Sequence, residues 1–298
     1  MLPEYPWPET RRIWIGLEQL GLDHGWTFDH HSWRTLRDGP WYDAVATLSA
    51  VAGSTSRMRL GTMVSTPNFR HPAVLAKHVM TIDELSGGRF VLGVGAGAPG
   101  PDTLVLGGAE LYGRERAGRF AEFVELSDLL LRNRRTTYTG RHFTTVDAHM
   151  VPGCVQFPRV PLAVAAAGPL ALSVAARYAD TWVTIGGTHT PGTQPERESW
   201  QLLEKQLRGL IDACQHHGRD PGEVDRLVNV SRIVTEPYSS ENRFVDIVGR
   251  CRELGFTDVV VNYPRPEGVF AGTEAAFESS VLAASEAFNC PPVASESA

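Results

Sequence analysis

Residues 71–95 read HPAVLAKHVMTIDELSGGRFVLGVG, and this stretch decides the fold. Over residues 71–85 the apolar side chains recur every three or four positions, which predicts an amphipathic helix. The apolar run at residues 90–94 has the length of a strand buried in a parallel sheet. A helix that leads into a buried strand is the repeating unit of an α/β fold.

The same alternation of short apolar runs and amphipathic segments extends along the chain in both directions. We expect strands at residues 26–28, 58–62, 90–94, 162–166, 181–185, 227–234 and 258–262. We expect helices at residues 9–20, 43–51, 71–85, 114–131, 169–178, 196–216, 242–254 and 273–288. Repeated βα units of this kind build a parallel sheet with helices packed against it.

Seven strands with eight helices fit a (β/α)8 TIM barrel. Its first strand would precede residue 9, but Pro3, Pro6 and Pro8 oppose a strand there, so we expect that strand to be short or missing, or the native start to lie upstream of Met1. A doubly wound open sheet is the alternative, but no GxGxxG turn follows the first expected strand. We predict a single barrel domain over residues 1–298, a length that α/β barrels reach.

Two connections are longer than the usual loops of a barrel. Residues 95–113 leave the fourth strand of the expected barrel, and residues 132–161 precede the fifth. The first connection borders the face where barrel active sites lie, so its start, GAGAPGPD, is expected to be a site loop. We expect the tail, residues 290–298, to be frayed.

Composition and charge narrow the class of partner. A net charge of −6 is too acidic to hold a nucleic acid without a concentrated basic face. No run of apolar residues is long enough to span a membrane, and residues 1–7 lack the segments of a signal peptide, so we expect a cytoplasmic protein that acts on a small molecule. The cysteines have no zinc-ligand spacing, and His216 and His217 are expected to form a solvated helix end, so no metal is predicted.

Polar residues that follow the expected strands are the candidates for chemistry, because barrel sites are built from the carboxyl ends of strands. Asp29, His30 and Trp33 follow the first apolar run and offer a hydrogen-bond acceptor, an imidazole that titrates near neutral pH and a stacking surface. The alternative is an ordinary polar loop with one buried histidine.

Two glycine-containing turns are further candidates. Gly95, Ala96 and Gly97 follow the strand at residues 90–94 and permit close contact between the backbone and a ligand. Ala167 and Gly168 lie between a strand and a helix, where free amides and the helix dipole favour an anion such as a phosphate. Turns of this composition are also common without a ligand.

Arginines begin the expected helix at residues 114–131. Arg114, Arg116 and Arg119 lie where they oppose the helix dipole. They form either a solvated helix face or a contact to an acidic ligand.

Several motifs follow one another in the order of one known family. The segments WTFDHHSW, RLGTMVSTPNFRHPAVLAKHVMTIDELSGGRFVLGVGAG, AAAGPLALSVAARYADTWV and LGFTDVVV resemble the luciferase-like flavin and deazaflavin oxidoreductases, which are (β/α)8 barrels. The resemblance covers residues 9–288. The Asp-His pair at Asp29 and His30 is more similar to the branch that uses coenzyme F420 than to the FMN branch.

The resemblance implies roles for individual residues. Asp29 would hydrogen-bond the deazaflavin head, and His30 would lie near the reactive carbon as a proton donor, with Trp33 beside the substrate. Met63 and Val64 match the position of a cis peptide bond that backs the ring.

The remaining cofactor contacts implied by the family come from the loops. Thr66, Gly95, Ala96 and Gly97 would line the cofactor, and the amides of Ala167 and Gly168 would bind its phosphate. Trp33 stands one residue closer to the Asp-His pair than in the related sugar-phosphate dehydrogenases. Those dehydrogenases carry a catalytic glutamate directly after the glycine-rich turn, where this chain has Ala98, which argues against sugar-phosphate oxidation.

The leading hypothesis is therefore an oxidoreductase that transfers a hydride between coenzyme F420 and a small organic substrate over the barrel mouth. One alternative is a monooxygenase that uses reduced FMN and a partner reductase. Another is a barrel that binds a flavin without catalysis, because fold does not imply function. We also expect a homodimer. The sequence leaves open the substrate and whether oxidation or reduction is the physiological direction.

Overall fold

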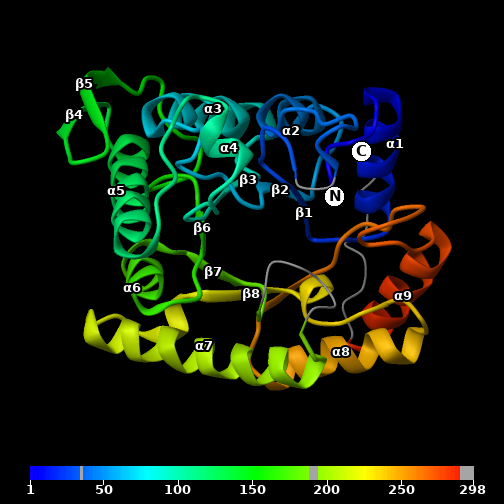
Figure 1. Ribbon diagram of the computed structural model, residues 1–298. Helices are drawn as coiled ribbons and strands as arrows, with labels where there is room; N and C mark the ends of the chain where they lie inside the picture. The colour runs from blue at the N-terminus through cyan, green and yellow to red at the C-terminus, as the bar shows by residue number, and fades with distance from the viewer. Residues whose placement is uncertain (34–35, 188–193, 289–298) are drawn as a thin grey trace.

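The computed structural model describes residues 1–33, 36–187 and 194–288. Its centre is a curled sheet of seven parallel strands in the order β1-β2-β3-β6-β7-β8-β9, with helices packed around the outside (Figure 1). The strands are β1 (His24–Thr27), β2 (Arg59–Thr62), β3 (Phe90–Val94), β6 (Leu162–Ala165), β7 (Thr181–Thr184), β8 (Asp225–Asn229) and β9 (Asp258–Val260). The loop at 188–193 and the tail with Cys290, expected to be frayed, lie outside the described residues.

Each helix of the outer layer follows or precedes a strand as the alternation predicts. The helices are α1 (Trp7–Gln19), α2 (Ala44–Ala52), α3 (Pro72–Ser86), α4 (Pro101–Leu104), α5 (Gly113–Arg132), α6 (Pro169–Tyr178), α7 (Glu196–His216), α8 (Glu241–Glu253) and α9 (Glu274–Ala287). In the described part of the chain, no helix has the length and apolar character needed to cross a membrane.

The N-terminal residues stand where the first strand of the barrel was expected. No strand precedes α1 in the described part of the chain. Met1 instead lies beside β1, where its carbonyl oxygen accepts a hydrogen bond from Thr27 Oγ1 at 3.2 Å. The two edge strands approach each other at His24 and Asp258, whose Nε2 and Oδ1 atoms are 3.1 Å apart. Over the described residues the sheet therefore begins at β1, in agreement with the expectation of a short or missing first strand.

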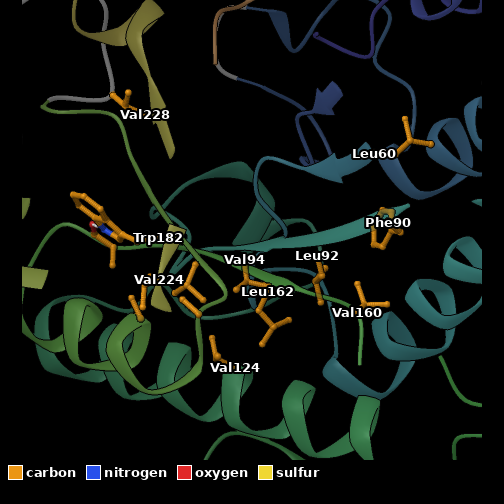
Figure 2. Packing of buried hydrophobic residues seen from close by; sticks show 14 of the residues in the cluster. Leu60, Phe90, Leu92, Val94, Val124, Val160, Leu162, Trp182, Val224 and Val228 are labelled. Carbon is orange, nitrogen blue, oxygen red and sulfur yellow. Dashed lines mark hydrogen bonds between the residues drawn. The ribbon is translucent and has the colours of Figure 1, made fainter. Parts of the chain in front are cut away.

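Strand β3 shows how the alternation of side chains builds two cores. Leu92 points outward, and Figure 2 shows it directed with Leu162 toward Val124 on α5. Val91 points to the barrel interior and packs there with Trp26. Gly61 makes room for that indole ring, because a Cβ at this position would lie 2.4 Å from it. Side chains such as Val91 and Trp26 thus fill the barrel interior, and a site can form at the carboxyl ends of the strands.

Both long connections predicted from the sequence are present and contain structure that the sequence reading missed. The first holds the short helix α4. The second folds into an antiparallel hairpin of β4 (Arg135–Thr139) and β5 (Thr144–His149), which pair only with each other. These strands are polar and mostly exposed, so they lack the apolar run by which a strand was recognised.

The strand predicted at residues 227–234 is wrong beyond Asn229. There the side chain of Asn229 accepts a hydrogen bond from Ser231 N at 3.2 Å and starts a 3-10 helix, η3 (Val230–Arg232). A run of apolar and β-branched residues concealed this asparagine turn. The correction matters for the site, because it moves Asn229 from mid-strand to a strand end.

Candidate active site

A cavity of about 560 Å³ opens at the carboxyl ends of the parallel strands. Its walls include Phe28 after β1, Thr66 after β2, Gly95 after β3 and Ala166 after β6. The volume lies within the range of cofactor and ligand sites. The cavity is therefore at the place where barrel enzymes carry out their chemistry.

The structure brings together at this cavity all the predicted site residues except Asp29. They are His30, Trp33, Met63, Val64, Thr66, Gly95, Ala96, Gly97, Ala167 and Gly168. They come from loops after four different strands, so the fold assembles them from distant parts of the sequence.

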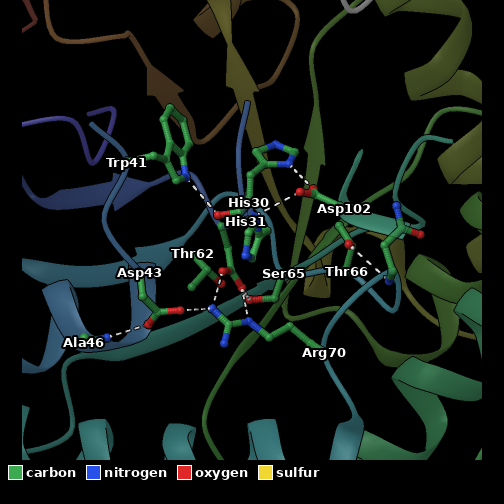
Figure 3. Close-up of polar contacts among 12 residues, drawn as sticks. His30, His31, Trp41, Asp43, Ala46, Thr62, Ser65, Thr66, Arg70 and Asp102 are labelled. Carbon is green, nitrogen blue, oxygen red and sulfur yellow. Dashed lines mark hydrogen bonds and ion pairs between the residues drawn. The ribbon is translucent and has the colours of Figure 1, made fainter. Parts of the chain in front are cut away.

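Asp29 lies in the wall behind the cavity and does not line it. Its side chain is fully buried, with Arg70 Nη2 2.6 Å from Oδ1 and Ser65 Oγ 2.5 Å from Oδ2. Arg70 also contacts Asp43, the N-cap of α2, at 2.6 Å (Figure 3). The structure differs here from the expected contact with the cofactor head, because both carboxylate oxygens of Asp29 bind groups of the protein.

His30, the next residue, faces the cavity. Its Nδ1 lies 2.5 Å from Asp102 Oδ2, and its carbonyl oxygen accepts a hydrogen bond from Trp41 Nε1 at 2.8 Å (Figure 3). The rings of Phe28 and Trp41 each lie 6.3 Å from the imidazole, edge to face. The ring is thus held on several sides while 28% of the side chain stays exposed.

An aromatic wall stands beside His30. The ring of Trp33 is stacked between Trp41 and Phe270, at centroid distances of 6.1 and 6.3 Å. The guanidinium of Arg232 packs over Phe270 at 5.0 Å and over Trp33 at 5.4 Å. Of this wall, Trp33 and Arg232 line the cavity, so a substrate there would meet an aromatic edge and one cation.

Met63 and Val64, which also line the cavity, are joined by a cis peptide bond, as the resemblance predicted. A Cβ at Gly95 would lie 2.5 Å from Val64 Cγ2, so glycine is required there for Val64 to keep its position. Asn229 Nδ2 lies 4.0 Å from the sulfur of Met63 at the cavity floor.

The glycine-rich turn is held by a polar side chain. Gly97 has a φ of +67°, and a Cβ there would lie 2.7 Å from Asn68. Asn68 Nδ2 donates to the carbonyl of Ala98 at 2.7 Å, and its Oδ1 accepts from Arg119. Burial, together with repulsion from Arg116, lowers the pKa of the Arg119 guanidinium. Arg119 therefore supports the turn, while Arg116 lines the cavity.

The N-terminus of α6 presents free amides at the cavity. Gly168 is the N-cap and has no side chain to satisfy them, and Pro169 occupies the first position of the helix. The amides of Leu170 and Ala171 have no acceptor within the helix. A Cβ at Gly168 would meet no atom within 4 Å, so space for an anion exists above this turn.

The model of the family described as luciferase-like monooxygenase matches residues 2–242 of this chain. The chain belongs to the luciferase-like family.

Curated relatives in this family carry two kinds of activity in their names. An F420-dependent glucose-6-phosphate dehydrogenase of Kineococcus radiotolerans is 35% identical over 218 residues, which cover 72% of this chain and 61% of the relative. A 4-hydroxyprotoasukamycin monooxygenase of Streptomyces nodosus subsp. asukaensis is 30% identical over 235 residues, which cover 78% of this chain and 60% of the relative. The chain thus spans about three fifths of the length of these relatives.

Solved structures confirm the luciferase-like barrel. An F420-dependent secondary alcohol dehydrogenase in complex with an F420-acetone adduct has a TM-score of 0.76 at 17% identity, with 94% of each chain covered. The monooxygenase RslO1 from Streptomyces bottropensis has a TM-score of 0.74 at 21% identity, with 96% of this chain and 94% of that chain covered. At these identities the similarity concerns the fold.

Among the polar residues of this luciferase-like cavity that sequence reasoning missed are Asp102, Asn229 and Arg232. Asp102 lies within the loop GAGAPGPD, where the acid after Pro101 was a signal of a helix start. Asn229 and Arg232 were placed inside the strand that was predicted too long. With that strand ended at Asn229, the search for polar residues at strand ends would have found both.

The cysteines described by the structure, and His217, lie outside the cavity lining. Cys154, Cys214 and Cys251 are free thiols, and burial raises the pKa of Cys251 to about 12. His217 caps the end of α7, with its Nε2 2.8 Å from Ser173 Oγ. Over the residues that the structure describes, no group of three or more histidine, cysteine or acidic side chains could hold a metal ion.

Proposed function

We propose that this luciferase-like protein is an oxidoreductase that uses coenzyme F420 and transfers a hydride to or from a small organic substrate at the barrel mouth. The observation that carries the proposal is that His30 and the uncapped N-terminus of α6 open onto the same cavity. The names of the relatives support the choice of cofactor, since the dehydrogenases among them are called F420-dependent. We also propose that residues 1–298 form one barrel domain.

The residues present fit such a cofactor. The cavity of about 560 Å³ is lined by backbone and small side chains at Gly95, Ala96 and Gly97, which lets a flat ring approach the chain. Met63 and Val64 would back that ring. The open space above Gly168 would hold the phosphate, bound by helix amides and favoured by the helix dipole.

The protein's part in the chemistry is to orient the substrate and to handle the proton. When bound, the deazaflavin supplies a ring carbon that exchanges a hydride and does not activate oxygen. His30 is positioned to hold or move the accompanying proton, because its ring lines the cavity and is fixed by Asp102. Trp33 lines the cavity but is 4% exposed, so it would meet the substrate at most with its edge and would help to exclude water.

Asp29 has a supporting role in this proposal. Its buried carboxylate holds Arg70 and Ser65, which fix the loop after β2 that includes the wall at Val64 and Thr66. We propose that it shapes the cofactor site from behind.

The surroundings of the substrate position disfavour a sugar phosphate. Ala98 lines the cavity where the resemblance leads one to expect a catalytic glutamate. Phe28 and Trp33 line the cavity and give this side of it an apolar character. We therefore propose a small organic substrate with an apolar part rather than glucose 6-phosphate.

A second candidate is an FMN-dependent monooxygenase. The observation that favours it is the similarity to the 4-hydroxyprotoasukamycin monooxygenase, which covers 78% of this chain. The phosphate cradle at Gly168 would accept FMN as well, since a phosphate group is common to both cofactors. The two candidates therefore predict different binding affinities for the deazaflavin ring of F420 and the flavin ring of FMN.

Parallel titrations with F420 and FMN test the proposal. Purified protein is titrated with each cofactor, and binding is followed by the change in cofactor fluorescence. We expect saturable binding of F420 that is at least about tenfold tighter than that of FMN, equivalent to about 1.4 kcal/mol. Tight binding of FMN without binding of F420 would overturn the proposal and favour the monooxygenase.

We also propose a cytoplasmic homodimer. The free thiols of Cys154, Cys214 and Cys251 suit a reducing compartment. Val74 and Leu85 on α3 are 57% and 53% exposed and lie on one face of that helix, which offers an apolar surface to a second copy. Light scattering of the purified protein tests the dimer, and a Val74→Lys variant should weaken it.

A further inference from the structure

Asp102 makes contacts that link the loop after β3 to the loop after β1. Its Oδ2 lies 2.5 Å from His30 Nδ1, and its Oδ1 accepts a hydrogen bond from the backbone amide of His31 at 2.9 Å (Figure 3). The same oxygen accepts from the amide of Ser32 at 3.5 Å. The carboxylate is 10% exposed and lines the cavity. Asp102 thus holds the imidazole of His30 through its Nδ1 atom.

These contacts decide which ring nitrogen carries the hydrogen. An ionised carboxylate can only accept hydrogen bonds, so the short contact requires a hydrogen on His30 Nδ1. In a neutral imidazole the other nitrogen, Nε2, then has a free lone pair. Within the residues that the structure describes, no protein group is bonded to Nε2, so this atom is available to a ligand.

We propose that Asp102 is a positioning residue that fixes His30 in the tautomer with hydrogen on Nδ1, so that Nε2 exchanges the proton that accompanies hydride transfer. The inference rests on the proposed function for the identity of the reaction. The geometry alone carries the assignment of the tautomer.

Other charged groups at the cavity do not duplicate this contact. Arg116 and Arg232 also line the cavity, but they come from α5 and η3, and Arg232 packs on the aromatic wall. Asp29 on β1's loop is engaged by Arg70. Among the described residues that line the cavity, Asp102 is therefore the only acidic one, and its carboxylate contacts His30.

The substitution Asp102→Asn separates positioning from structural support. Asparagine has the same shape, and its carbonyl oxygen can still accept from the amides of His31 and Ser32. Its amide group would then donate toward His30 Nδ1, which forces the hydrogen of the neutral ring onto Nε2. We therefore expect the loops to stay in place while the tautomer reverses. Glu110→Gln is the matched control, because it neutralises an exposed carboxylate outside the cavity lining.

Nitrogen NMR of protein labelled at histidine measures the tautomer directly and needs no cofactor. The His30 signals are assigned by their loss in His30→Gln. We expect the wild type and Glu110→Gln to carry hydrogen on Nδ1, and Asp102→Asn to carry it on Nε2. A wild-type ring with hydrogen on Nε2 overturns the proposal, and this spectrum decides even if the variant does not fold. An unchanged tautomer in folded Asp102→Asn overturns it as well.

Acylation by diethyl pyrocarbonate gives a second readout. The lone pair of an unprotonated ring nitrogen attacks a carbonyl carbon of the reagent and displaces ethyl carbonate. In the wild type that nitrogen is the accessible Nε2. In Asp102→Asn the unprotonated atom is Nδ1, covered by the asparagine, so we expect His30 to react at least about tenfold more slowly. Equal rates in the two proteins would contradict the proposal.

An F420 titration of the same samples keeps the two proposals apart. Loss of the expected F420 binding in the wild type would remove the proposed function and leave the tautomer result standing. Normal F420 binding with the opposite tautomer would remove only the role of Asp102.

Discussion

Asp29 and Arg70 form a buried ion pair in which Nη2 lies 2.6 Å from Oδ1. The pair lies behind the cavity wall, while His30, the next residue after Asp29, faces the cavity. Two adjacent polar residues thus have different surroundings: Asp29 contacts Arg70 and Ser65 of the loop after β2, and His30 lines the cavity. This division follows from the alternating directions of side chains where a strand ends.

Replacement of Arg70 by methionine should destabilise the protein strongly. The change leaves the fully buried Asp29 carboxylate without its cation, which typically costs about 3–5 kcal/mol. We expect a lower urea midpoint and weakened F420 binding. Arg141→Met is the control, because its pair with Glu115 is exposed and should contribute at most about 1 kcal/mol.

The second substitution Asp29→Asn tests the cause of that loss. In an Arg70→Met background it removes the uncompensated buried charge, so part of the stability should return. If Arg70→Met unfolds no more readily than Arg141→Met, the ion pair does not organise this wall.

The search for polar and glycine residues at strand ends located the cavity, and its failures have a physical reason. His30 and Gly95 were found because barrel geometry brings strand ends together regardless of sequence distance, whereas Thr66 was named only through the family resemblance. Asn229 was missed because β-branched and apolar residues continue past the true end of β8. A side-chain turn at one asparagine ended the strand, and periodicity does not register such a turn.

Asp102 could not be paired with His30 from the sequence. The two residues are 72 positions apart, and their contact depends on how the glycine-rich turn and α4 fold across the barrel mouth. The direction of Asp29 was equally hidden, since its partner Arg70 lies in a loop after another strand. Fold and site location follow from local patterns, but the orientation of each side chain depends on loops that meet only in the folded chain.

Substitution of Gly168 by aspartate should abolish cofactor binding while leaving the fold intact. The added carboxylate has room and would cap the α6 amides, so stability should be retained or slightly increased. The same carboxylate would repel a phosphate and take its donors. We expect at least about a hundredfold weaker F420 binding, equivalent to about 2.8 kcal/mol. Gly168→Ala, which adds no charge, should bind much better, and normal binding by the aspartate variant would place the phosphate elsewhere.

Glu18 predicts a pH-dependent contribution to stability far from the site. Burial alone would raise its pKa, but hydrogen bonds from the amides of Met58, Arg57 and Ser56 lower it below the ordinary value of 4.5. A lowered folded-state pKa means that the ionised carboxylate stabilises the fold above the unfolded pKa and that this contribution is lost as the pH falls through the folded pKa.

Melting temperatures of the wild type and Glu18→Gln test this. The variant should melt lower at pH 7, and the difference should shrink as the pH falls below 4.5 and through the lowered folded-state pKa, because the Glu18 carboxylate then becomes neutral. A difference that is the same at pH 7 and pH 3 would show that the hydrogen bonds at residues 56–58 do not depend on the charge of Glu18.

Removal of the His30 imidazole should slow turnover far more than it weakens binding of the cofactor. The ring lines the cavity, and its Nδ1 is held by Asp102. A positioned acid or base typically contributes about 10²-fold or more, so we expect His30→Ala to lower kcat by at least that factor. The F420 dissociation constant should change little, because the cofactor's expected contacts lie at residues 63–66, 95–97 and 167–168.

Single-turnover hydride transfer with a small secondary alcohol as surrogate, measured beside F420 binding, separates the two effects. A histidine with only a packing role would instead lose stability and cofactor affinity together, and an unchanged rate with weakened binding would remove His30 from the chemistry.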